Sequence, residues 1–376
     1  MILARSCARI AAAVFAVVSP LALAATIESA EFSAHLRRPV ALQLSANEDC
    51  LFVANRRGGS VSIVDLTNKK SVAEFAVGKQ LSDLVVTPDQ KWLLATDEAA
   101  HELVVIEINA SQPVETRLAV KSRLPVSPYP VSVSVTRDGR RGFVASLWSR
   151  RLTMVELPAT DDGQARITRV VDLPIAPRNQ LLVQNDSRLI VADSFAGKLA
   201  VVDTQSGEIA GVRDFPGHNV RGLGVSADGR MLIISHQMLN DYAHTIRNDV
   251  HWGLLMSNDL RWLRLDKVLA GGGDLFEGGH MHPLGHAGNA TGDPAGLTVT
   301  SGGSVVVTLG GVGEIALGRE SDFSLQRAAV GKRPTAVVAS RDGQRAFVAN
   351  TFGDSISIVD LANREQTAEI SLGPQS

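Results

Sequence analysis

The apolar residues of this chain fall in short, strand-like runs that recur at a fixed spacing. Two copies share the same order of runs: a segment that begins with Arg-Pro, a run that ends in Ala-Asn, and a run that ends in Ile-Val-Asp-Leu. They are residues 38–41, 51–55 and 60–66 in the first copy and residues 333–336, 346–350 and 355–361 in the last. Alternating β-branched residues bounded by turns indicate antiparallel strands, and the spacing predicts a repeat of about 41 residues with four short strands.

The turn between the first and second strands of each unit identifies the remaining copies. Asp-Gly, a tight-hairpin signal because glycine accepts positive φ, stands at residues 138–139, 228–229 and 342–343, with degenerate versions at 87–90 and 184–187. Seven units follow, which begin near Pro39, Leu81, Pro130, Arg178, Val220, Pro294 and Pro334. A period near 40 with four strands per unit predicts an all-β fold, a seven-bladed β-propeller of four-stranded antiparallel blades. We expect residues 25–376 to form this single domain.

The Phe-Val-Ala-Asn and Ser-Ile-Val-Asp pattern resembles the YVTN family of β-propeller repeats over residues 39–373. That family includes surface-layer proteins, lactonase-like enzymes and redox-associated periplasmic proteins, so the resemblance implies the fold but does not choose a function. In the fifth unit, residues 235–240 (SHQMLN), 251–253 (HWG) and 279–282 (GHMH) resemble the propeller portion of bacterial proteins that join such repeats to a dihaem cytochrome domain. This second resemblance implies a c-type cytochrome as partner, either on a separate polypeptide or in a part that follows the last repeat.

The first 24 residues are predicted to be a secretory signal peptide. Arg5 and Arg9 precede the apolar residues 10–23, and Ala22-Leu23-Ala24 fits the small-x-small rule for cleavage. The apolar stretch is short for a transmembrane helix, and no other segment approaches that length. We therefore expect a periplasmic or secreted protein that is cleaved near Ala24 and has no integral membrane segment; an uncleaved anchor is the alternative.

Cysteine content and net charge exclude several classes of function. Cys7 belongs to the predicted signal peptide, which leaves Cys50 alone in a run that reads as a buried strand. A lone cysteine excludes an internal disulfide, a Cys-x-x-Cys zinc site and a covalently attached c-type haem in this chain. The formal net charge of −2 offers no basic face for nucleic acid. The sequence contains no Ser-His-Asp order, nucleophile elbow, Walker loop or dinucleotide fingerprint.

The fifth unit departs from the other six. We expect its second strand at residues 231–235, its third at 252–256 and its fourth near 260–265, with insertions at 236–250 and 269–293. In a propeller, loops between the second and third strands open on the same face as loops that lead to the next blade, so we expect both insertions side by side. They hold six of the nine histidines of the chain: His236, His244, His251, His280, His282 and His286.

Two interpretations of these histidines stay open. The His-x-His pair at 280 and 282 places two imidazoles on one side of an extended segment, which suits a divalent metal ion or contact with a haem edge. Alternatively, the loops are structural or dock a partner. In the first insertion, Asp241 and Asp249 supply either oxygen ligands or helix caps, and Trp252 is expected to pack rather than to stack on a cofactor.

Arginines recur at the start of the first strand in several units: Arg38, Arg178, Arg221 and Arg333. If they point toward the ring axis, they line the mouth of the channel and attract an anion or a carboxylate substrate. The alternative is that they cap the turns before these strands.

Two functions are consistent with the sequence. The first is a non-catalytic binding or docking module in a redox or cytochrome-associated assembly, with the His-rich loops on one face. The second is a lactonase-like or metal-assisted hydrolase with its site at the channel mouth, where the histidines hold a water-activating ion.

Overall fold

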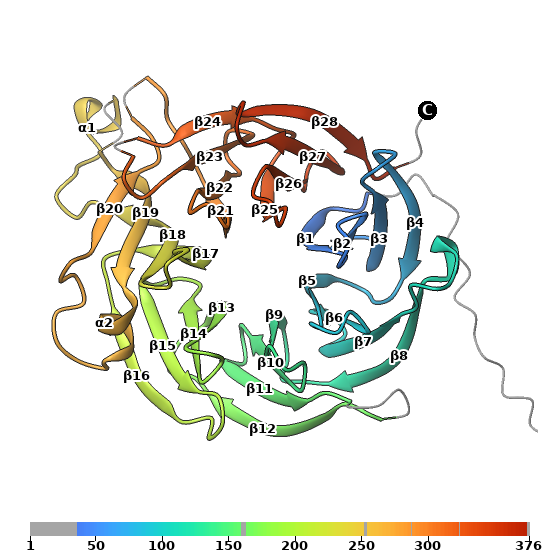
Figure 1. The fold of residues 1–376 in the computed structure, drawn as a ribbon. Coiled ribbons are helices and arrows are strands. Elements are labelled where there is room, and N and C mark those ends of the chain that lie inside the picture. Colours follow the sequence, from blue (N-terminus) through green and yellow to red (C-terminus); the bar gives the residue numbers. More distant parts are fainter. Residues whose placement is uncertain (1–35, 159–162, 252–253, 287, 323, 374–376) are drawn as a thin grey trace, which may run out of the picture.

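The computed structural model describes residues 36–158, 163–251, 254–286, 288–322 and 324–373, and in this part of the chain seven four-stranded sheets form a closed ring (Figure 1). In every sheet the four strands pair in chain order and antiparallel. The predicted seven-bladed propeller is confirmed. The predicted signal peptide lies outside the described residues.

The first four blades begin within two residues of the predicted starts. Blade 1 contains β1 (Pro39–Leu44), β2 (Cys50–Asn55), β3 (Ser60–Asp65) and β4 (Lys70–Ala76). Blade 2 contains β5 (Leu81–Val86), β6 (Trp92–Asp97), β7 (Glu102–Ile108), the short 3-10 helix η1 (Val114–Thr116) and β8 (Leu118–Pro125). Blade 3 contains β9 (Pro130–Val135), β10 (Arg141–Ser146), β11 (Arg151–Glu156) and β12 (Arg166–Asp172). Blade 4 contains β13 (Pro177–Val183), β14 (Arg188–Asp193), β15 (Lys198–Asp203) and β16 (Ile209–Asp214).

The last three blades include the two α-helices of the described residues, both in blade 5. Blade 5 contains β17 (His218–Val225), β18 (Met231–Leu239), α1 (Arg247–His251), β19 (Met256–Arg264), α2 (Leu265–Leu269) and β20 (His280–Pro283). Blade 6 contains β21 (Pro294–Val299), β22 (Val305–Leu309), β23 (Glu314–Gly318) and β24 (Gln326–Ala329). Blade 7 contains β25 (Pro334–Ala339), β26 (Arg345–Asn350), β27 (Ser355–Asp360) and β28 (Glu365–Ser371).

The position of a strand within its blade decides its hydrophobic pattern. Middle strands such as β2, in which all six residues are buried, are covered on both faces by neighbouring blades and are therefore almost continuously apolar. The outermost strands face solvent; in β12, six of the seven residues are exposed. The free thiol of Cys50 is buried at the start of β2, and burial raises its pKa, as expected for a structural cysteine.

The inner strands share a backbone irregularity. In all seven blades the register between the first and second strands shifts close to the start of the first strand. In blade 1, for example, Pro39 pairs with Asn55 and Ala41 with Ala54, so Val40 has no partner residue. A bulge of this kind changes the direction of a side chain, and residues left unpaired at these bulges, such as Val40 and Ser82, line the centre of the ring.

Among the described residues, the first and last blades exchange no strand where the ring closes. Apolar residues of the two blades, Leu51 and Val53 on one side and Phe347 and Ile356 on the other, form one buried cluster. At the same junction, the backbone N–H groups of Arg37 and Arg38 donate to the carboxylate of Asp354 at 3.2 and 2.7 Å. Packing and backbone capping therefore hold the two ends of the chain together.

Blade 5 differs from the sequence prediction. β19 pairs with β18 along nine residues, from Met231 opposite Arg264 to Leu239 opposite Met256, so the third strand is residues 256–264 and not 252–256. The predicted fourth strand is the end of this third strand, and the true fourth strand, β20, lies inside the expected second insertion. The prediction failed because β19 carries buried polar residues, Asp259 and Arg261 among them, whereas residues 252–256 look more strand-like. Trp252 lies outside the described residues.

No helix among the described residues is long and apolar enough to cross a membrane.

A buried ion pair between Arg37 and Glu74 stabilises the segment before β1, where blades 1 and 7 meet. Both side chains are 1% exposed, and the guanidinium Nη2 lies 2.7 Å from Glu74 Oε2. Glu74→Ala leaves the buried guanidinium without this carboxylate, so we expect a loss of about 3–5 kcal/mol in the free energy of unfolding, measured by guanidinium denaturation. The double variant Arg37→Met/Glu74→Leu should lose much less. A single variant as stable as the wild type would contradict this role.

Candidate functional site

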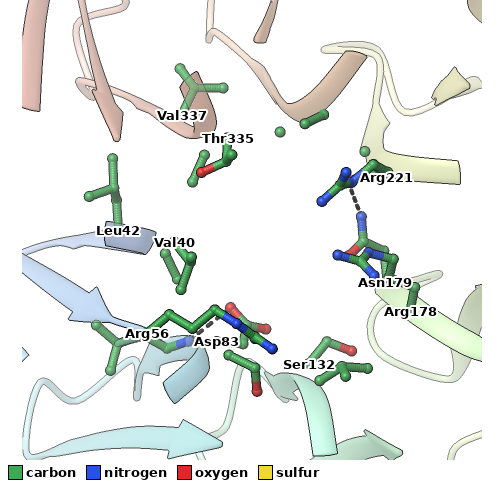
Figure 2. Close-up of a pocket in the computed structure, with 18 of the residues that line it drawn as sticks. Val40, Leu42, Arg56, Asp83, Ser132, Arg178, Asn179, Arg221, Thr335 and Val337 are labelled. Atoms are coloured by element: carbon green, nitrogen blue, oxygen red, sulfur yellow. Dashed lines mark hydrogen bonds between the residues drawn. The ribbon is translucent and has the colours of Figure 1, made fainter. Parts of the chain in front are cut away.

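A cavity of about 600 Å³ occupies the centre of the ring and is lined by the first strands of all seven blades (Figure 2). Residues from the turns between second and third strands, such as Arg56 and Glu98, line its mouth. We call the face of the ring that carries these turns the b–c face. The cavity is therefore a central channel whose charged mouth opens on the b–c face.

The bulge in each inner strand decides which side chain faces the channel. In blade 4, Pro177 pairs with Asp193 and Asn179 with Ala192, so Arg178 is the bulged residue. Four other blades place a small neutral residue at this position, and all four residues line the same cavity: Val40, Ser82, Val131 and Thr335. Blade 4 alone among these five puts a guanidinium there.

Three arginines crowd one end of the channel. Figure 2 shows Arg178 and Arg221 beside Asn179 on one side of the cavity, with Arg56 reaching in from a neighbouring side. Desolvation, followed by repulsion from Arg221 and Arg56, lowers the pKa of Arg178 to about 10. Arg178 therefore stays protonated at neutral pH, at a cost in free energy that a bound anion would reduce.

The three other arginines of the mouth form ion pairs with two carboxylates. Arg56 pairs with Glu98, with Nη2 and Oε2 2.6 Å apart. Asp293 bridges Arg221 at 3.1 Å and Arg333 at 2.5 Å. Within the described residues, no hydrogen bond or ion pair of the Arg178 guanidinium is found. Among the described arginines that line the cavity, Arg178 is thus the one without an ion pair.

The wall opposite Arg178 is apolar. Val40 and Leu42 from blade 1 and Val337 from blade 7 line it (Figure 2). Histidine, cysteine, methionine and tyrosine are absent from the described residues that line the cavity. The described lining therefore combines a cationic side, an apolar side and polar residues such as Thr335, and it includes no side chain that ordinarily ligates haem iron.

Of the four arginines predicted to line the channel mouth, the structure brings three together. Arg178, Arg221 and Arg333 line the cavity. Arg38 does not: its guanidinium lies over the ring of Phe352 at 4.9 Å and donates to the carbonyl of Thr351. For Arg38, the capping alternative describes the contacts better.

His236 is an internal residue. Its side chain is fully buried; Nδ1 lies 2.9 Å from the carbonyl oxygen of Gln237, and Nε2 accepts a hydrogen bond from Arg261 Nε at 3.3 Å. Burial lowers its pKa to about 4, so the ring is neutral at pH 7. With both ring nitrogens engaged, His236 has no lone pair free for a ligand.

His280 and His282 lie on the outer strand β20, away from the channel. Their rings pack on the buried indole of Trp262, with centroid distances of 5.1 and 4.5 Å, and the two imidazole centroids are 5.0 Å apart. His280 Nε2 lies 3.6 Å from Glu320, which belongs to the connection between the third and fourth strands of blade 6. That connection lies on the face opposite the b–c face. The expectation that all six histidines share one face is therefore wrong for this pair.

The other three histidines are exposed and lie toward the b–c face. His244 and His251 belong to the connection between β18 and β19, and His286 to the connection between β20 and β21. The described residues contain no group of three His, Cys, Asp or Glu side chains that could hold one metal ion. A divalent metal at the His-rich segments stays a prediction from the sequence.

The sequence prediction missed Arg56, Glu98, Asp293 and Asp83. A signal was available for the first two: both follow the last residue of a second strand, and the equivalent Thr351 also lines the channel. An alignment of the repeats places these three residues at the same position of their units. Asp293 and Asp83 become functional candidates only through the partners that the ring brings to them.

Asp83 is a half-buried carboxyl on the channel wall. Its Oδ2 accepts the backbone N–H of Val133 in the next blade at 2.9 Å, and desolvation raises its pKa to about 6. Because the folded chain holds this proton more tightly than the unfolded chain does, ionisation of Asp83 destabilises the fold as pH rises from about 4 through 6.

We expect Asp83→Asn, whose amide oxygen can still accept from Val133, to be more stable than the wild type above pH 6. The gain is on the order of 2 kcal/mol and should vanish near pH 4. Denaturation curves at several pH values measure it. Asp228→Asn is the control: Asp228 is exposed, and its hydrogen bond from Ser226 lowers its pKa, so no gain is expected there. A pH-independent effect of Asp83→Asn would refute the assignment.

Comparisons with known proteins agree on a propeller. Hydrazine synthase from Kuenenia stuttgartiensis superposes with a TM-score of 0.73 at 20% identity, over 87% of this chain and 96% of that chain. Virginiamycin B lyase from Staphylococcus aureus gives 0.59 at 13% identity, over 84% and 92%. The Swd1 β-propeller domain from Myceliophteria thermophila gives 0.63 at 12% identity, over 87% and 98%. At these identities the structural likeness shows the fold alone.

The search of curated proteins finds no match to this chain. The comparison with family models does: residues 40–227, half of the chain, match the model described as the Cytochrome D1 heme domain, a propeller family. The match covers the first four blades and the start of the fifth, including Arg56, Asp83 and Arg178 of the channel, and is consistent with the YVTN-like repeats. This chain belongs to the Cytochrome D1 heme domain family.

Proposed function

We propose that this chain is an exported, periplasmic docking module that binds a c-type cytochrome within a redox assembly. The observation that carries the proposal is the concentration of exposed apolar side chains on the b–c face. Soluble monomeric proteins rarely expose large contiguous apolar patches, and where such patches occur they commonly mark interaction sites.

Ten of the fifteen exposed large hydrophobic residues lie in the turns between second and third strands or in the extended hairpin of blade 5. They are Trp148, Phe195, Leu239, Tyr242, Ile246, Val250, Leu254, Met256, Val312 and Phe352. Trp148 and Phe195, which are 61% and 55% exposed, belong to adjacent blades, and their ring centroids are 5.5 Å apart. Aromatic residues together with arginine are the composition typical of protein–protein hot spots.

The choice of partner rests on the comparisons. The family is named for a cytochrome domain, and the similar hydrazine synthase chain has the same propeller fold over almost its whole length. The predicted signal peptide and the absence of a CxxCH motif fit a module that meets a haem protein outside the cytoplasm. A partner that carries its own covalent haem is therefore the candidate that we favour.

The family name also implies a haem in the propeller itself, and the residues present do not fit one. Haem iron is held by histidine, cysteine, methionine or tyrosine, and the described residues that line the channel include none of these.

The hydrolase alternative has less support. Metal-assisted hydrolysis needs several ligands near the substrate site, but His280 and His282 lie on the outer strand of blade 5, and His236 is internal. The likeness to virginiamycin B lyase, at 13% identity, concerns the fold. Docking is the function that more of the described geometry supports.

Site-specific photo-crosslinking tests this proposal. A photoreactive phenylalanine at position 148 should yield, in the cells that make the protein, a crosslinked product that stains for covalent haem. The double substitution Trp148→Ala/Phe195→Ala should reduce binding of that partner by about tenfold or more, because hot-spot aromatics contribute about 2 kcal/mol each. Both side chains are exposed, so the melting temperature should hardly change.

The control position is Ile167 on the outer strand β12, which is exposed but lies away from the b–c face. A photoreactive residue there should give no haem-staining product. Haem-free products from position 148, or equal yields from both positions, would argue against a cytochrome partner on this face.

A further inference from the structure

We infer that the mouth of the central channel binds a small monocarboxylate with an apolar body, and that Arg178 holds the carboxylate. This inference goes beyond docking, because the site lies inside the ring and not on its surface. Three features carry it: an unpaired guanidinium, the charge balance of the mouth and the apolar wall opposite.

Arg178 is half-buried on the channel wall, and its guanidinium has no hydrogen bond or ion pair within the described residues. Burial and two neighbouring guanidiniums lower its pKa to about 10, which means that its charged form is disfavoured where it lies. A partly desolvated guanidinium without a partner is stabilised when an anion binds it, because the anion replaces the water that the cavity wall excludes. A carboxylate is the anion that matches the guanidinium fork with two parallel hydrogen bonds.

The charges of the mouth favour a monoanion. Four guanidiniums, of Arg56, Arg178, Arg221 and Arg333, gather there. Three carboxylates offset these positive charges. Glu98 and Asp293 form ion pairs with the arginines, and Asp83 lies deeper in the channel. With these three ionised, one positive charge remains, which one carboxylate neutralises. A phosphate dianion would leave a surplus negative charge in a desolvated cavity.

One side of the cavity suits an apolar body, although polar residues such as Thr335 and Ser132 also line it. Val40, Leu42 and Val337 form the wall opposite Arg178, and the volume of about 600 Å³ accommodates a short aliphatic chain or one aromatic ring. Binding a ligand there removes apolar surface from water, which contributes about 25 cal/mol per Å². A carboxylate without an apolar body, such as acetate, would therefore bind more weakly than a longer acid.

Arg178 is also preorganised for this contact. The bulge that directs its side chain to the axis is fixed by regular pairing on both sides, Pro177 with Asp193 and Asn179 with Ala192. The Asn179 amide donates to the backbone carbonyl of Arg221 in the next blade, which ties the two strands that carry the arginines. Ligand binding therefore requires little rearrangement of the backbone.

Calorimetric titration and thermal melting with hexanoate, benzoate, acetate and inorganic phosphate test the inference. We expect hexanoate or benzoate to bind the full chain and raise its melting temperature, with acetate weaker and phosphate without effect. Arg178→Gln should reduce the affinity at least tenfold, and Arg178→Lys, which keeps the charge without the fork, should lie between. The unliganded melting temperature of Arg178→Gln should not fall, since that variant loses no hydrogen bond of the described structure.

The matched control is Arg140→Gln, which removes an equal charge from an exposed turn on the opposite face of the ring. It should bind hexanoate like the wild type. Unchanged affinity in Arg178→Gln, tighter binding of phosphate than of hexanoate, or no binding of any acid at millimolar concentration would overturn the inference.

One outcome would show that the carboxylate bound by Arg178 belongs to a protein partner and not to a free acid. If no free acid binds but Arg178→Gln weakens the haem-staining crosslink at position 148, the anion is an acidic side chain of the docked partner, and the free-ligand inference fails. The Trp148 and Phe195 variants test docking independently, so either proposal can fail while the other stands.

Discussion

Closure of the ring is the constraint on which the rest of this structure depends. Each blade has two faces that need covering, so the seven sheets are stable only if the last packs against the first. Leu51 and Phe347, almost 300 residues apart in sequence, belong to one buried cluster at that junction, and Asp354 caps the backbone before β1. Without closure, blades 1 and 7 would each expose an apolar face, and the channel would have no wall.

Closure of the ring brings the bulges of the inner strands together around one central cavity. Each inner strand carries a bulge near its start, and the ring directs these bulges toward one axis. The residue at the bulge can therefore differ from blade to blade, while the arrangement of the four strands stays the same. At this position blade 1 has Val40 and blade 4 has Arg178, which divides the cavity into an apolar and a cationic side. Desolvation within the channel lowers the pKa of Arg178 and raises the pKa of Asp83.

The channel mouth and the exposed aromatic residues occupy the same face, because both derive from the turns between second and third strands. Arg56 follows β2 and lines the channel, whereas Trp148 lies in the corresponding turn of blade 3 and is exposed to solvent. A partner docked on Trp148 and Phe195 would lie near the channel opening. The described residues that line this channel include three arginines beside Arg56 and no side chain that ordinarily ligates haem iron, although the chain belongs to the Cytochrome D1 heme domain family.

The sequence by itself determined the seven blades, their starting points and three of the arginines at the channel mouth, because repeated strands and tight turns are local patterns that recur along the chain. It did not determine blade 5, where Asp259 and Arg261 are buried in β19 and hide its strand pattern, so that register with β18 decided the assignment. Nor did it separate His236, enclosed by Arg261 and Phe215, from His280 and His282 on the outer strand. Those contacts join side chains on different strands, and only the pairing and packing of the strands set which polar groups meet.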